Sequence, residues 1–258
     1  MSVLKEIYAY REMIYNLVRK DLRGKYMGTA LGFLWTFVNP LLQLIVYNMV
    51  FSMILRSHIE KFYLFLFIGL VPWTFTSACL TGGSTSVVSE SHMVTKIYFP
   101  REALPVAFVT SAFATMLLCF LVVFLVVFLS GVPVNILTWL FLIPVMLLQY
   151  IMGLGIAMIT SAVTVYFRDL QHILGVAQLA WMFLTPIMYD INIVPAKLLP
   201  VFYLNPMVPI VTAYRDILYY AKFPALGTLS SAFIFGVVIL VLGFLAFGRL
   251  KRGFAEEL

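Results

Sequence analysis

Long runs without charged residues dominate the chain. Asp, Glu, Lys and Arg are absent from residues 27–55, 62–89, 103–167, 170–189 and 223–248. An α-helix rises about 1.5 Å per residue, so roughly 20 apolar residues cross a hydrocarbon layer about 30 Å thick. The pattern therefore predicts an all-α integral membrane protein.

The run 103–167 is long enough for two crossings. Between its apolar halves stands Ser130-Gly131-Val132-Pro133-Val134-Asn135, a combination of Gly, Pro and Asn that is typical of a tight turn. We therefore expect six transmembrane helices, at 31–55, 62–89, 103–129, 136–167, 173–189 and 226–248.

Two further segments have patterns of their own. In residues 1–26, apolar side chains such as Ile7, Ile14 and Val18 recur at helical spacing while charged residues fill the remaining arc, which predicts an amphipathic helix on the membrane surface. Residues 190–222 hold four prolines among apolar and aromatic residues, a pattern that favours short re-entrant or interfacial helices that cap the outer mouth. We treat residues 1–258 as a single transmembrane domain.

Composition supports this interpretation. The chain is 63% hydrophobic and 11% charged, with a mean hydropathy of +1.02, and leaves no room for a soluble catalytic domain. With both termini in the cytoplasm, twelve basic residues fall on the inner side and five on the outer side, as the positive-inside rule prefers. The net charge of +6 therefore indicates membrane orientation and not nucleic-acid binding.

The expected membrane interior has no group that could move charge. No predicted span carries an acidic or basic residue at its centre, which argues against proton coupling. The three histidines lie on different loops, so we predict no catalytic or metal site. No P-loop is found either, so ATP and Mg²⁺ are expected on a separate ATP-hydrolysing partner subunit.

Aromatic residues suggest two candidate sites. In the cytoplasmic segment 90–102, the stretch Lys96-Ile97-Tyr98-Phe99-Pro100-Arg101 could insert into a groove on a partner, or could equally anchor at the membrane surface. Flat aromatic rings also suit the faces of sugars, and we select as lining residues of a passage Trp35, Tyr47, Trp181 and Tyr189.

Several short motifs follow one another along about four fifths of the chain. They are Lys20-Asp21-Leu22-Arg23-Gly24-Lys25-Tyr26, Leu31-Gly32-Phe33-Leu34-Trp35, Asn39-Pro40-Leu41, Tyr98-Phe99-Pro100-Arg101 with Leu104-Pro105, Val165-Tyr166-Phe167-Arg168-Asp169-Leu170, Thr185-Pro186-Ile187, Tyr203-Leu204-Asn205-Pro206 and Tyr214-Arg215. In this order and spacing, the chain resembles the membrane subunits of bacterial ATP-binding-cassette exporters for O-antigen and related polysaccharides or polyol phosphates.

The resemblance implies a homodimer in the bacterial inner membrane, paired with two nucleotide-binding ATPase subunits and enclosing a channel for a lipid-linked glycan. It also implies three sets of site residues. These are an ATPase-docking segment (Lys96, Ile97, Tyr98, Phe99, Pro100, Arg101), a cytoplasmic gate (Lys20, Asp21, Arg23, Lys25, Tyr26) and an external gate in 190–222 (Asn205, Pro206, Tyr214, Arg215).

From the sequence we therefore expect a non-enzymatic permease subunit that exports an O-antigen-like, lipid-linked polysaccharide. One alternative is an exporter of the same architecture for teichoic acid, a drug or a lipid. A membrane-embedded glycosyl transferase or ligase would need an outer carboxylate such as Asp190 or Asp216. The docking segment argues against a passive channel.

Overall fold

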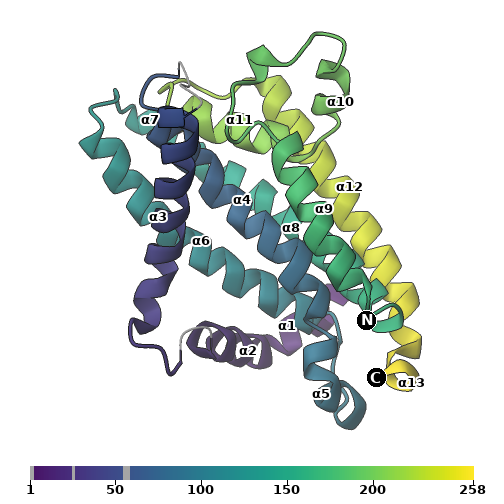
Figure 1. The fold of residues 1–258 in the computed structure, drawn as a ribbon. Coiled ribbons are helices and arrows are strands. Elements are labelled where there is room, and N and C mark those ends of the chain that lie inside the picture. Colours follow the sequence, from purple (N-terminus) through teal and green to yellow (C-terminus); the bar gives the residue numbers. More distant parts are fainter. Residues whose placement is uncertain (1–2, 25–26, 55–58) are drawn as a thin grey trace.

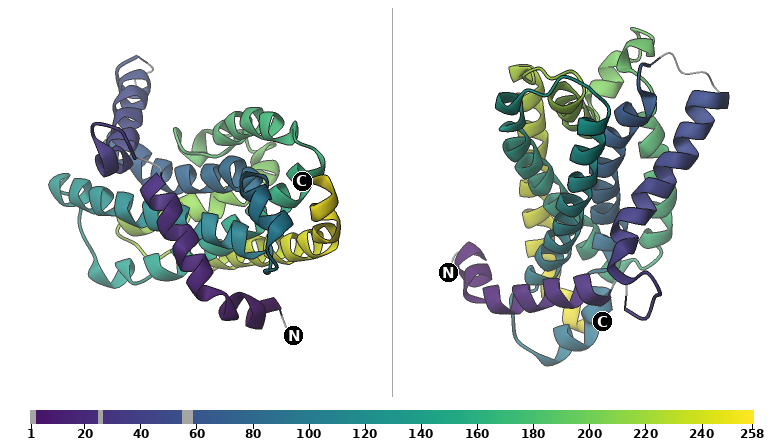
Figure 2. Two further views of the ribbon diagram at one scale, coloured as in Figure 1. Left: turned by 90° about the horizontal axis from the view of Figure 1, so that it is seen from below. Right: turned by 90° about the vertical axis from the view of Figure 1, so that its left-hand side faces the viewer.

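The structure, a computed structural model, describes residues 3–24, 27–54 and 59–258. Lys25 and Tyr26 of the expected cytoplasmic gate lie outside the described residues, as does Leu55 at the end of the first expected span. Throughout the described ranges the regular structure is helical, without strands. Six of the described helices run between the two ends of the bundle (Figures 1 and 2): α3 (Trp35–Asn48), α4 (Phe62–Thr85), α6 (Ala103–Leu129), α8 (Leu142–Tyr166), α9 (Leu170–Leu184) and α12 (Leu226–Leu250).

Short helices close both ends. One end, which we call the basal end, holds both ends of the chain, with α1 (Val3–Ala9), α2 (Arg11–Gly24), α5 (Ser91–Lys96) and α13 (Phe254–Glu257). The amphipathic helix expected over 1–26 is thus divided into α1 and α2, and α2 lies across the base of the bundle (Figure 2). The opposite, distal end holds α7 (Ile136–Trp139), α10 (Leu199–Tyr203) and α11 (Met207–Leu218).

Helix α4 is the centre of the bundle. Seventeen of its 24 residues are buried, and it packs against α3, α6, α8, α9 and α11. A helix that is apolar on every side is stable only when protein or lipid surrounds it completely. A deep polar contact of α4 is made by Gln149 of α8, whose Nε2 donates to the carbonyl oxygen of Pro72 at 2.7 Å and whose Oε1 accepts from the Tyr214 hydroxyl at 2.9 Å. The buried amide is therefore bonded on both sides.

Five of the described helices are long and apolar enough to cross a membrane, and α9 is a shorter apolar helix of 15 residues, about 22 Å in length. We expected this span at 173–189, whereas the helix itself runs from Leu170 to Leu184. The helix stops at Leu184 because Thr185 precedes Pro186, and the residue before a proline avoids the helical conformation. Since α9 is short, the count of six membrane crossings stays a prediction.

Other boundaries also differ from those expected. The first span, expected at 31–55, is α3 followed by a π-helix over Met49–Ile54. The second ends at Thr85 instead of residue 89, where side-chain hydroxyls bond to backbone carbonyls three or four residues back and compete with the helix. The fourth, expected at 136–167, is divided into α7 and α8, which places Pro144 in the first turn of α8, where no amide hydrogen is needed.

Helices α8 and α12 touch backbone to backbone. A Cβ atom added to Gly243 would lie 2.7 Å from the carbonyl oxygen of Gly155, and one added to Gly155 would lie 2.6 Å from the backbone of Ile239. Glycines therefore allow the two helices to approach this closely, as small residues do in membrane bundles. The pair forms one packed unit along its length.

We expect Gly243→Leu to lower the thermal unfolding temperature of the detergent-solubilised protein. The side chain would meet backbone atoms that cannot move aside, and overpacking of this kind costs about 1–3 kcal/mol. Gly248→Leu is the matched control, because a Cβ there meets nothing within 4 Å. Equal unfolding temperatures for the two variants would contradict the close contact of α8 and α12.

Candidate functional site

The basal loop that follows α5 presents two side chains outward. Helix α5 ends at Lys96, and Ile97 is in an extended conformation. Tyr98 is 94% exposed and Ile97 59% exposed, whereas Phe99 is 5% exposed and packs in a second apolar core with Phe247 and Phe254. Ile97 and Tyr98 therefore lie on the outer side of the loop, and Phe99 lies on its inner side.

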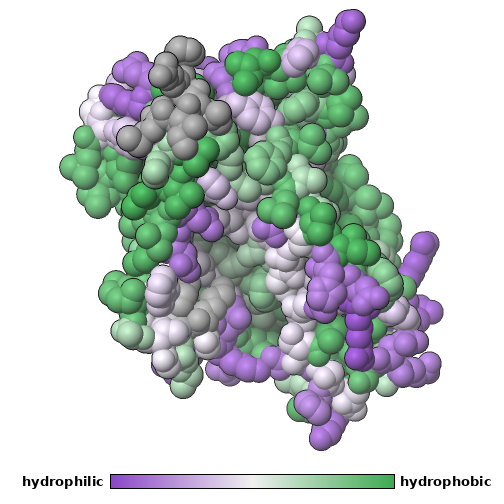
Figure 3. All heavy atoms as spheres, viewed as in Figure 1, coloured by the Kyte–Doolittle hydropathy of each residue, from purple (hydrophilic) through white to green (hydrophobic). Residues whose placement is uncertain are grey.

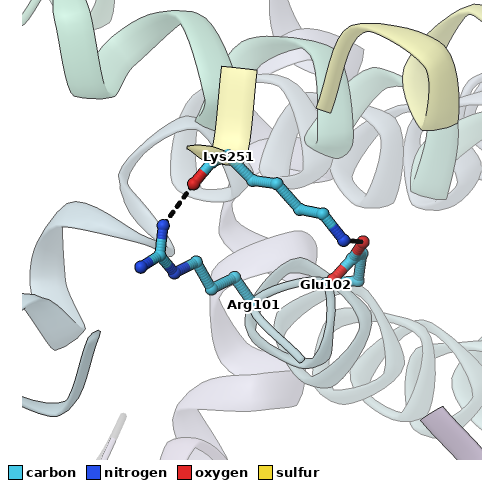
Figure 4. A network of polar contacts seen from close by, with 3 residues as sticks. All are labelled: Arg101, Glu102 and Lys251. Atoms are coloured by element: carbon cyan, nitrogen blue, oxygen red, sulfur yellow. Dashed lines mark hydrogen bonds and ion pairs between the residues drawn. The ribbon is translucent and has the colours of Figure 1, made fainter. Parts of the chain in front are cut away.

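The next residues of the loop are tied to the end of the last long helix (Figure 4). The Arg101 guanidinium donates to the backbone carbonyl of Lys251, and the Lys251 ammonium pairs with Glu102 at 2.5 Å. Glu102 is only 2% exposed, and the Arg101 guanidinium also lies 5.8 Å from the centre of the Phe254 ring. We call this set of contacts between Arg101, Glu102 and Lys251 the basal clasp.

The six residues expected to dock an ATPase thus divide into two groups. Lys96, Ile97 and Tyr98 are exposed, while Phe99 and Arg101 contact the rest of the same chain, with Pro100 between them. Beside them is a cavity of about 510 Å³. Its lining comprises Glu6, Ala9, Tyr10, Ile97, Tyr98, Phe99, Pro100, Arg101, Lys251 and Arg252. A partner can therefore reach Ile97 and Tyr98 directly.

Helix α2 carries Lys20, Asp21 and Arg23 of the expected cytoplasmic gate, and the first two of these bond to other parts of the chain. Lys20 pairs with Glu90 at 2.6 Å, and Asp21 accepts a hydrogen bond from Ser111 of α6. Arg23 is exposed. A cavity of about 420 Å³ lies between α2, α4 and α6, with Lys20, Asp21, Thr85 and Glu90 among its lining residues.

One long face of the bundle carries polar residues. Helices α3 and α9 flank α4, and Figure 3 shows hydrophilic side chains in the hollow between them. Asn39 and Gln43, one helical turn apart on α3, are exposed and line a groove of about 220 Å³ together with Trp35. Amides exposed at this depth would lack partners in lipid, so the face fits contact with water or polar groups better. We call this the polar face.

The four aromatic residues selected for a passage lie in different surroundings. Trp35 lines the groove on the polar face, and Tyr47 is half-buried against the core. The Trp181 indole donates to the Asn205 side chain at 2.8 Å and meets the Trp73 ring edge to face. The Tyr189 hydroxyl donates to the carbonyl of Phe183. Of the four, Trp35 therefore lines a groove, whereas the polar atoms of Trp181 and Tyr189 already have hydrogen-bond partners within the chain.

The expected external gate residues attach α11 to the chain that follows α9. The Asn205 amide donates to the Thr185 hydroxyl at 2.9 Å, and Arg215 donates to the carbonyl of Ile187 at 2.7 Å while lying 3.4 Å from the centre of the Phe65 ring. Pro206 directly precedes α11, and Tyr214 is fully buried. These residues hold the distal segment together within one subunit.

An ion pair also occurs at the distal end. Asp216 pairs with Lys222 at 3.1 Å. Burial raises the pKa of the Asp216 carboxyl, and the Lys222 ammonium partly opposes that change. Within the described ranges, no group of three or more His, Cys, Asp or Glu side chains could hold a metal ion.

Several residues of these sites were missed from the sequence. Glu102 and Lys251 form a pair across 149 positions, for which no local pattern gives a signal. Asn39 and Gln43 could have been found, because they are polar residues four positions apart in an apolar helix, a spacing that places them on one face.

Comparison with known proteins identifies relatives over the whole chain. The model of the ABC-2 type transporter family matches residues 12–219. The chain is 34% identical over 264 residues to the O-antigen export system permease protein RfbA of Myxococcus xanthus, covering all of both proteins. It is 28% identical to an RfbA permease of Klebsiella pneumoniae, covering 96% of this chain and 95% of the relative. With the polysialic acid transport protein KpsM of Escherichia coli it shares 22% identity, covering 78% of each chain. The chain is therefore a multi-pass membrane protein that belongs to the ABC-2 type transporter family.

Proposed function

We propose that this chain forms the membrane channel of an ATP-driven exporter that moves a lipid-linked, O-antigen-like polysaccharide outward across the bacterial inner membrane. The observation that carries the proposal is the full-length match to a permease named for O-antigen export. A second relative named for polysialic acid transport supports a polysaccharide as the cargo class. The chain itself is a transporter component and not an enzyme.

The polar face supports assembly as a homodimer. A second copy related by a two-fold axis would cover the same face of both chains, as in most symmetric dimers. Asn39, Gln43 and Trp35 would then line a passage between the copies instead of facing lipid. Amide groups and an aromatic ring suit the hydroxyls and flat faces of a sugar chain.

The basal loop is the proposed docking point for the nucleotide-binding subunit, with one such subunit per copy. We therefore call it the docking loop, and we call the 510 Å³ cavity beside it the docking cavity. The basal end would face the cytoplasm, in agreement with the positive-inside distribution of Lys and Arg. Tyr98 and Ile97 offer an exposed ring and an exposed aliphatic side chain next to a cavity, the arrangement of an anchor that inserts into a partner. ATP and Mg²⁺ would be held by the partner, which supplies the energy.

The two proposed gates lie at opposite ends of the passage. Helix α2 would act as the cytoplasmic gate, since Lys20 joins it to Glu90 on the connection that leads to the docking loop. At the distal end, Asn205 and Arg215 fasten α11 to the segment after α9. Opening the outer mouth would therefore move α9 and α11 together.

We expect Tyr98→Ala to reduce recovery of the ATPase subunit with the affinity-purified permease and to lower glycan at the cell surface. The reason is the loss of the most exposed aromatic anchor of the loop. Tyr8→Ala is the matched control, because Tyr8 is a 70% exposed tyrosine on α1 that does not line the docking cavity. Undiminished ATPase recovery with Tyr98→Ala would remove the loop from the docking surface.

We expect the double variant Asn39→Leu/Gln43→Leu to slow glycan export while the ATPase still binds and hydrolyses ATP. The change removes hydrogen-bonding groups from the proposed passage without touching the basal end. The matched control Asn39→Gln/Gln43→Asn keeps both amides and should export close to the wild-type rate. Export would be followed by surface labelling of the glycan after induction, and unchanged export by the leucine variant would exclude the polar face as the passage.

A further inference from the structure

The pairing of Glu102 with Lys251 is costly and incompletely satisfied. Removing two charges from water carries a desolvation penalty that their attraction often fails to offset, so a buried ion pair is weak evidence for stability. Glu102 is almost fully buried, and among the described residues its Oε2 atom has no hydrogen-bond partner. Stability alone therefore does not account for the pair.

The pair joins the start of α6 to the end of α12. Glu102 directly precedes α6, next to the docking loop, while Lys251 directly follows α12. Arg101 adds a second contact, to the backbone of Lys251, and Phe99 adds a third through Phe247 and Phe254. The loop is thus fixed to the end of α12 by an ion pair, a hydrogen bond and apolar packing.

Helix α12 carries this connection into the bundle. It packs along α8, where Gly155 and Gly243 bring the two backbones into contact. Such an interface has little freedom to slide, so a displacement of the basal end of α12 moves α8 with it. Helix α8 in turn supplies Gln149 to the centre of α4.

A second ionic contact of this region, between Lys20 and Glu90, is more exposed to solvent. Lys20 and Glu90 are bonded at 2.6 Å, but the Lys20 side chain is 66% exposed. Solvent and salt screen such pairs, and their contribution is small. The ion pair that is better shielded from solvent therefore connects the docking loop to α12.

We propose that Glu102 and Lys251 are positioning residues that transmit the ATPase stroke: they fix the docking loop to α12, so that a displacement of Ile97 and Tyr98 by the ATPase moves the α8–α12 pair. This proposal rests on the proposed function of the chain as an ATP-driven permease. In this proposal the basal clasp is the mechanical connection between the ATPase and the bundle, and α12 is the first helix that it moves.

The test compares Glu102→Gln, Lys251→Met and the double variant Glu102→Gln/Lys251→Met in the complete complex with its ATPase. Each single variant leaves a buried or half-buried group without its partner and is expected to lower the amount of protein in the membrane. The double variant removes both charges and should restore that amount. If the pair transmits the stroke, the double variant still binds the ATPase and hydrolyses ATP, but exports about tenfold less glycan than the wild type.

Two controls separate transmission from simple charge neutralisation. Arg249→Met removes a positive charge from the exposed side of the last turn of α12 and should export normally. Lys251→Arg keeps a cation opposite Glu102 and should retain most of the export. Wild-type export by the double variant would overturn the proposal, because it would show that the pair only compensates two charges.

Hydrogen–deuterium exchange gives a readout that does not depend on the cargo. In the wild type, binding of the ATPase should protect both the docking loop and residues 247–258. In the double variant the protection of residues 247–258 should be smaller, because only the Arg101 and Phe99 contacts remain. Equal protection of residues 247–258 in both proteins would also overturn the proposal. If the wild type binds its ATPase and shows this protection but exports no glycan, the proposed cargo is wrong, whereas the proposed role of the basal clasp is supported. If no ATPase binds the wild type, both proposals fall.

Discussion

The complete burial of α4 is the constraint on which the rest of this structure depends. A helix with apolar side chains on every side must be enclosed, and here α3, α6, α8, α9 and α11 enclose it. Polar groups inside such an enclosure need partners from the protein, and the Gln149 amide is bonded to the Pro72 carbonyl and to Tyr214. Because Tyr214 belongs to α11, this contact also links the core of the bundle to its distal end.

Burial of α4 also decides where polar groups can lie. The charged residues are displaced to the two ends, and the amides of Asn39 and Gln43 are left on the exposed side of α3, on the flank of α4. Exposing a polar face between α3 and α9 to lipid costs free energy, because its amides would lack hydrogen-bond partners there. Beside a passage the same amides can bond to water or to a polar substrate. The physical cost of this face is therefore the strongest argument that a second copy and a hydrated substrate cover it.

At the basal end, one short loop both presents exposed side chains and packs against the rest of the chain. Ile97 and Tyr98 are exposed, whereas Phe99 is buried in the second apolar core. The exposed half offers a surface to a partner, and the buried half attaches the loop to Lys251 and Phe254. A loop that is exposed on one side and fixed on the other can pass on a force, which a fully solvated loop cannot do.

The sequence by itself determined the membrane character, the helix-rich fold, the hairpin turn near Gly131 and the family, because these depend on the length of apolar runs and on short motifs in order. It placed α9 imperfectly, since the effect of Pro186 on Thr185 outweighed a continuous apolar run. Only the tertiary structure decided which side chains of 96–101 point outward and that Glu102 meets Lys251. The reason is physical: helices such as α4 and α6 are apolar on all sides, so their periodicity does not indicate which face meets which neighbour.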